Sequence, residues 1–98
     1  MAIDVVIQDE NGACIARYDG PPLRHQFTAL APPESACFRF ILPWADATFN
    51  EEQIKVLKDE IRSAASDCPP ARLGELQALS SFLEGASGAH TYVKFIGD

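Results

Sequence analysis

The side chains that could do chemistry in this 98-residue chain are few and stand far apart in the sequence. The two histidines, His25 and His90, belong to the residue type suited to proton transfer near neutral pH. His90 stands two residues before Tyr92 in a strand-like segment, and residues two apart on a strand share a face. With a carboxylate such as Asp46 beside them, His90 and Tyr92 would line a pocket for a ligand or a reaction. No pattern brings Asp46 there, and a purely structural role for each histidine is the alternative.

Three further residues are candidates for binding. Trp44 stands in a predicted loop, where it either caps the core or stays exposed as an anchor for a partner. Asp46 either binds a ligand or accepts hydrogen bonds from backbone N–H groups of its own turn. Asp98 carries a side-chain and a terminal carboxylate, which suit a cation or the N–H groups of another chain, unless this end is simply solvated. The candidate binding set is therefore Trp44, Asp46, His90, Tyr92 and Asp98, and no catalytic residue is assigned.

The sequence lacks the motifs that nucleotide-binding and zinc-dependent proteins use. The chain has neither a nucleotide-binding glycine pattern nor a His-Glu-x-x-His zinc helix. Its cysteines, Cys14, Cys37 and Cys68, are odd in number and widely spaced, so we expect reduced thiols in a cytoplasmic protein. The sequence predicts no cofactor and no metal.

The net charge and the distribution of the charged residues limit the classes of molecule that the protein can bind. Eight Lys and Arg against 14 Asp and Glu give a net charge of −6, with the cations scattered among the acids. This balance argues against nucleic acid and against an anionic membrane surface, both of which need clustered cations. No apolar run is long enough to span a membrane, and residues 1–8 lack the basic start of a signal peptide. A basic protein partner fits the charge, although the charge also serves solubility alone.

Strand patterns dominate the first half of the chain. Residues 1–9 and 13–19 alternate in polarity around Asn11-Gly12, which predicts a hairpin with a two-residue turn and with Ile7 opposite Ala16. Residues 36–42, with alternating phenylalanines, form the strongest predicted strand. Residues 23–31 fit a strand or a loose turn equally well.

Helix signals dominate the second half. Asn50 fits an N-cap with Gln53 as its capping-box partner, and Glu51–Lys55 is a favourable charge pair four residues apart. This helix should end near Ser66, and Pro70 can open a second one. The apolar stripes of both helices predict a hairpin. Residues 90–96 then form a last strand. The fold class expected is α+β: one domain, residues 1–98, a two-layer sandwich whose mostly antiparallel sheet of four or five strands carries the helix hairpin on one face.

Two short motifs carry a family resemblance. Asp46-x-Thr48-Phe49-Asn50 before the helix, and His90-x-Tyr92-x-Lys94-Phe95-x-Gly97-Asp98 at the end, are similar to a group of small bacterial proteins of unknown function. The resemblance implies a bacterial cytoplasmic protein and implies no activity.

Three hypotheses follow. The favoured one is a non-enzymatic interaction module, of immunity or regulatory type, that meets a basic partner through an acidic surface. The second is a small enzyme or ligand-binding domain with a pocket around His90, Tyr92 and Asp46. The third is a homodimer joined through a strand edge or through the leucine-rich second helix.

Overall fold

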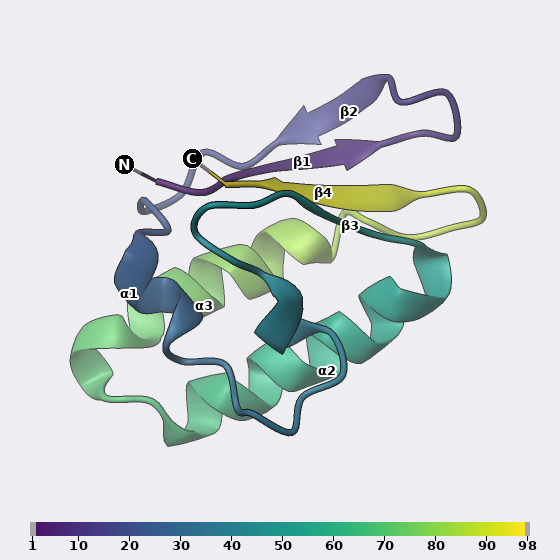
Figure 1. Ribbon diagram of the computed structural model, residues 1–98. Helices are drawn as coiled ribbons and strands as arrows, with labels where there is room; N and C mark the ends of the chain where they lie inside the picture. The colour runs from purple at the N-terminus through teal and green to yellow at the C-terminus, as the bar shows by residue number, and fades with distance from the viewer. Residues whose placement is uncertain (1, 98) are drawn as a thin grey trace.

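A computed structural model describes residues 2–97 of the chain, without the side chain of His25. It confirms the α+β fold: a four-stranded sheet in the order β2-β1-β4-β3, antiparallel throughout, covered on one face by two long helices (Figure 1). The elements in chain order are β1 (Asp4–Gln8), β2 (Cys14–Arg17), α1 (His25–Thr28), the 3-10 helix η1 (Phe38–Phe40), β3 (Ala47–Phe49), α2 (Glu51–Asp67), α3 (Pro70–Leu83) and β4 (Tyr92–Ile96).

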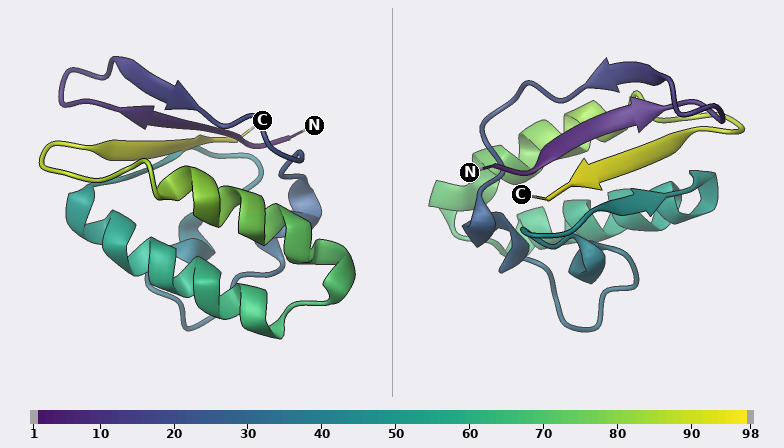
Figure 2. Two further views of the ribbon diagram at one scale, coloured as in Figure 1. Left: turned by 180° about the vertical axis from the view of Figure 1, so that it is seen from behind. Right: turned by 45° about the horizontal axis from the view of Figure 1, so that its top comes forward.

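The core lies between the sheet and the helix hairpin. Alternate residues of β1 and β4 point into it, as the period of a half-buried strand requires. The helices contribute their apolar stripes to the same cluster, whose fully buried members include Val5, Phe95, Leu57, Ile61, Leu76, Leu79 and Leu83. The opposite face of the sheet carries no helix (Figure 2, right). Any binding on that face must therefore involve the strand residues whose side chains point away from the helices.

The β1–β2 hairpin has the predicted pairing but a different turn. Ile7 lies opposite Ala16, as expected. The loop, however, holds three residues rather than two, because the N–H of Asp9 donates to the Ala13 carbonyl at 3.0 Å. The Asp9 carboxylate accepts from the N–H groups of Asn11 and Ala13, a side-chain turn that favours the longer loop. A bulge beside Ile7 then restores the expected register.

The start of α2 confirms the capping prediction. The Asn50 side chain accepts from the Gln53 N–H at 2.9 Å, and the Gln53 side chain accepts from the Asn50 N–H at 2.9 Å. The predicted pair between Glu51 and Lys55 is not formed, because Lys55 binds Glu52 at 3.2 Å instead. Glu51 is thereby left without an ionic partner among residues 2–97.

The second helix begins at Pro70, as predicted, and the last strand occupies the centre of the sheet. β4 pairs with β1 from Asp4–Ile96 to Gln8–Tyr92 and with β3 on its other side. The two ends of the chain therefore form neighbouring central strands (Figure 1).

The prediction of a strand over residues 36–42 is wrong. The segment turns through η1, and its buried residues follow helical spacing instead of alternation: they are Cys37, Phe38 and Ile41. Phe40, expected on the same face as Phe38, is 52% exposed. The third strand is β3, in the stretch that had been expected to link strand and helix. Residues 23–31 are neither strand nor loose turn, since Leu23 makes a single bridge to Ile3 and α1 follows.

One carboxylate from α2 accounts for this difference. Glu60 accepts hydrogen bonds from the backbone N–H groups of Ala36, Cys37 and Phe38. Backbone N–H groups that a strand would pair with a neighbouring strand are paired here with a side chain 22 to 24 residues away. Burial alone would raise the pKa of Glu60, but the three N–H donors and the nearby Arg39 outweigh it and hold the pKa below its ordinary 4.5.

We expect Glu60→Gln to destabilise the fold by about 1–2 kcal/mol at neutral pH, because an uncharged amide is a weaker acceptor for N–H donors. The folded pKa is lowered, so the carboxylate's contribution is complete above the unfolded-state pKa and disappears as pH falls through the folded pKa. The difference in unfolding free energy between wild type and variant should therefore shrink below pH 4.5, measured by urea denaturation. Glu34→Gln, at an exposed position, is the control and should show no such trend. A difference that stays constant with pH would refute the assignment.

Asn50→Ala should lower the unfolding free energy by about 1 kcal/mol, because it removes one half of the capping box. Ser63→Ala, at an exposed position of the same helix, should change stability by far less. Equal effects of the two substitutions in chemical denaturation would show that the cap does not stabilise α2.

Candidate functional site

Asp46 and His90 lie at opposite ends of β4. The Asp46 carboxylate accepts from the Gly97 N–H at 3.1 Å and lies 3.8 Å from the Lys94 ammonium, beside the last residues of the strand. His90 precedes the strand, with its ring Nδ1 3.5 Å from a carboxylate oxygen of Glu10. An extended strand of five residues is about 17 Å long, so the structure does not bring Asp46 and His90 together.

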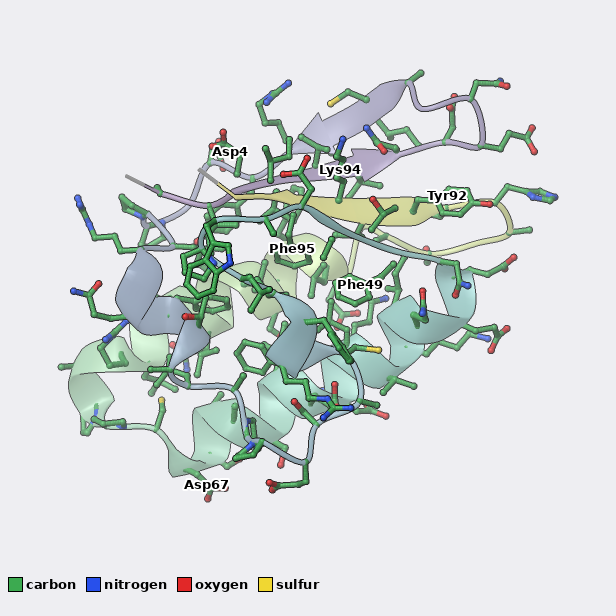
Figure 3. All side chains as sticks on the ribbon, viewed as in Figure 1. Asp4, Phe49, Asp67, Tyr92, Lys94 and Phe95 are labelled. Atoms are coloured by element: carbon green, nitrogen blue, oxygen red, sulfur yellow. The ribbon has the colours of Figure 1, made fainter. Side chains whose placement is uncertain are left out.

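His90 and Tyr92 also do not share a strand face. The strand begins at Tyr92, and His90 adopts a positive φ of 60° in the turn before it. Its backbone N–H lies 3.5 Å from a carboxylate oxygen of Glu51. Tyr92 points outward from the sheet, together with Asp4 and Lys94, whereas Phe95 points toward the helices (Figure 3). Asp98, the remaining candidate, lies outside the described residues.

Trp44 is the most exposed large apolar side chain, with 72% of its surface accessible, so it does not cap the core. The main chain of Trp44 and Ala45 packs tightly against Gly97. A Cβ added at Gly97 would collide with the backbone of both residues, which explains why glycine follows β4 here. Trp44 is therefore fixed beside the end of β4 where Asp46 also lies.

The outer face of the sheet has one row with a clear role in the fold. Val6 lies between Arg17 on β2 and Lys94 on β4, and it is only 3% exposed although no helix covers it. The aliphatic stems of long basic side chains cover apolar neighbours in this way while their charged ends stay in water. Arg17 and Lys94 thus shield Val6.

The next row, toward the C-terminal end of β4, is acidic. Asp4 pairs with Ile96, and Asp46 lies on the other side of that strand end. Tyr18, one residue beyond β2, donates its N–H to the Val5 carbonyl, so Asp19 follows at the same end of the sheet as Asp4. We call the three carboxylates of Asp4, Asp19 and Asp46, together with the neighbouring Trp44, the acidic end.

The acidic end is incompletely neutralised. Lys94 pairs with Asp46, but within residues 2–97 neither Asp4 nor Asp19 has an ion-pair partner. Burial raises the pKa of the Tyr18 hydroxyl, and the carboxylates of Glu75 and Asp19 raise it further. The predicted hairpin already implied that Asp4 and Asp19 lie at one end of the two strands, but neither residue was among the candidates.

Within residues 2–97, neither the cysteines nor the possible metal ligands form a candidate site. Cys14 is exposed, Cys37 is buried and Cys68 is half-buried, and all are free. Burial raises the pKa of the Cys37 thiol, and the Glu60 carboxylate adds to the shift. Over residues 2–97, no three His, Cys, Asp or Glu side chains gather as metal ligands, and no helix has the length and apolarity to cross a bilayer.

No family model, curated protein or solved structure matches this chain. The resemblance to small bacterial proteins therefore stays a prediction, and the function must be argued from the geometry.

Gly97→Ala should destabilise the protein by about 1–3 kcal/mol, because the added methyl group must displace the backbone beneath Trp44. Gly74→Ala is the matched control, since a Cβ there meets open space on α3 and alanine is the better helix former. Thermal or urea unfolding should show opposite signs for the two substitutions. A neutral effect of Gly97→Ala would contradict the close packing at this corner.

Proposed function

We propose that the protein is a non-enzymatic, cytoplasmic interaction module, of immunity or regulatory type, whose acidic end binds a basic segment of a partner protein. The observation that carries this proposal is that Asp4 and Asp19, at the same end of the sheet as the exposed Trp44, have no ion-pair partner among residues 2–97. The free state of the cysteines suits a reducing compartment.

Charge supports a basic occupant. A Lys or Arg docked at this end would pair with carboxylates that have no ion-pair partner within residues 2–97. The overall charge of −6 would also steer a basic partner toward the protein and speed association.

The exposed indole supports a protein partner in particular. Tryptophan is enriched among residues that dominate binding energy, and its indole stacks well on cationic side chains. The main chain of Trp44 is packed against Gly97, so docking has to order only the side-chain torsions of the indole. It is also the only tryptophan in the chain, which makes its fluorescence a direct reporter of binding.

The test compares two double variants that remove equal charge. Immobilised wild-type protein should capture a basic partner from lysate at low salt and release it as salt rises. With the purified partner, Asp4→Asn/Asp19→Asn should weaken binding about tenfold or more, while Glu34→Gln/Asp67→Asn should bind like wild type. Urea denaturation of the first variant should match that of wild type, because Asp4 and Asp19 form no ion pair within residues 2–97, and this measurement separates a loss of binding from a loss of fold. Equal binding by both variants, or no capture at low salt, would refute the proposal.

Trp44→Ala should weaken the same complex by about 2 kcal/mol or more, since it removes the anchor. Ile15→Ala is the control, because Ile15 is a comparably exposed apolar residue on the edge strand β2, with 62% of its surface accessible. Titration calorimetry measures both. If Ile15→Ala weakens binding and Trp44→Ala does not, the partner docks on the sheet edge instead of the acidic end.

A further inference from the structure

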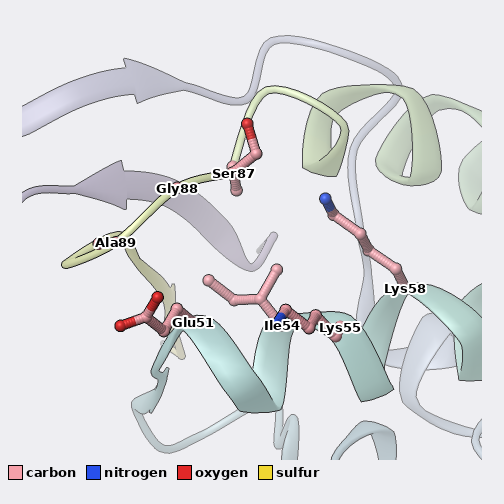
Figure 4. A pocket seen from close by; sticks show the side chains of 8 residues that line it. Glu51, Ile54, Lys55, Lys58, Ser87, Gly88 and Ala89 are labelled. Carbon is pink, nitrogen blue, oxygen red and sulfur yellow. The ribbon is translucent and has the colours of Figure 1, made fainter.

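A cleft of about 240 Å³ opens between α2 and the loop that joins α3 to β4 (Figure 4). Its α2 wall is one stripe of the helix, and its other wall is the loop 86–89. The site is separate from the acidic end, which lies at the other end of β4. An inference here therefore goes beyond the proposed function and does not depend on it.

The cleft has a charge of opposite sign at each end. Glu51 lies near Ala89, and Lys58 rises from α2 at the far end, with Ile54 between them (Figure 4). Within the described part of the chain, neither Glu51 nor Lys58 forms an ion pair. The two residues are seven positions apart on the helix, about 10 Å along its axis, which is too far for them to neutralise each other.

Each charged end has further polar groups at hand. One Glu51 oxygen accepts from the His90 N–H at 3.5 Å, which leaves the second oxygen open. At the loop, the backbone N–H groups of Ser87, Gly88 and Ala89 donate to no acceptor among residues 2–97. Gly88 takes a positive φ of 99°, the conformation of loops whose successive N–H groups can receive an anion.

The floor between the charges is apolar. Ile54 and Ala86 are both buried at 2% exposure, and they separate the Glu51 carboxylate from the Lys58 ammonium. Lys55 also lines the cleft, but its ammonium is paired with Glu52 at 3.2 Å. A ligand that satisfies the whole cleft needs an anionic group, a short apolar body and a cationic group in that order.

We propose that this cleft binds a short peptide with free ends, its carboxylate at Lys58 and Ser87 and its ammonium at Glu51. A single amino acid is too short to reach both ends, whereas two or three extended residues span about 7–10 Å. The cleft is smaller than a typical drug-sized pocket, so the side chains of the peptide must be small.

Dialanine and trialanine are the probes, each tested against the full chain by NMR titration. Saturable shifts should be confined to the amides of Ser87, Gly88 and Ala89 and to the Ile54 methyl groups. The N-acetylated and the C-amidated peptides should each bind about tenfold more weakly, because each lacks one charge-assisted contact.

Substitutions of Lys58 and Glu51 test which end of the peptide each residue binds. Lys58→Met and Glu51→Gln should each lower the affinity of the free peptide about tenfold. Lys58→Met should abolish the advantage of the free carboxylate, and Glu51→Gln that of the free amine. Lys94→Met, on the outer sheet face, and Glu34→Gln, at an exposed position away from the cleft, remove equal charges and should leave the affinity unchanged.

Three results would overturn the proposal: titrations with both peptides that do not saturate, blocked peptides that bind as well as free ones, or control variants as weak as Lys58→Met. The Asp4→Asn/Asp19→Asn protein should bind the probes like wild type. If the cleft does not bind the probe peptides, the proposal for the acidic end still stands. If the acidic end does not bind a basic partner, the proposal for the cleft still stands.

Discussion

The insertion of β4 between β1 and β3 is the constraint on which the rest of the structure depends. The register from Asp4–Ile96 to Gln8–Tyr92 joins the two ends of the chain, so the sheet cannot be completed until the helix hairpin has crossed beneath it. β3 has only three residues, and β4 is its neighbour in the sheet. Such pairing between distant segments makes folding slow relative to a protein of local contacts. It also fixes the position of every site, because loops at both ends of β4 carry the polar groups discussed above.

Most of the fold could be predicted because its signals are local. The capping box at Asn50, the proline at position 70 and the alternation in β4 each depend on residues within one element. The failures involve partners that are distant in sequence. The alternating phenylalanines near position 38 are typical of a strand, but Glu60 takes the N–H groups that a strand would need. β3 is too short to show a period, and it exists because β4 lies beside it.

The sites were less predictable than the fold, since a site joins residues from several elements. Asp46 and His90 lie at opposite ends of β4, and no periodicity in the sequence could exclude or require their contact. The exposure of Trp44 depends on how its main chain packs against Gly97. The motif Gly97-Asp98 was recognised in the sequence, but the sequence did not show that this glycine contacts Trp44. The stripe of Glu51 and Lys58 was readable from helical spacing. Its opposite wall was not, because only the α3–β4 connection brings the loop 86–89 across it.

Some charged residues contribute to the fold, and others lack an ion-pair partner within residues 2–97. Arg17 and Lys94 cover Val6, Glu60 satisfies backbone N–H groups, and Arg72 holds Glu75 at 2.9 Å along one helix face. These charges would be kept in a protein with no partner. Asp4 and Asp19 have no ion-pair partner among residues 2–97, and Glu51 and Lys58 lie apart in one cleft while Asn50 and Gln53 already cap the helix. Glu51 lies in the first turn of α2, where the helix dipole favours a carboxylate, and only one of its oxygens is used, by the His90 N–H. Since none of these four residues forms an ion pair within the part of the chain described, they are where interactions with other molecules are expected.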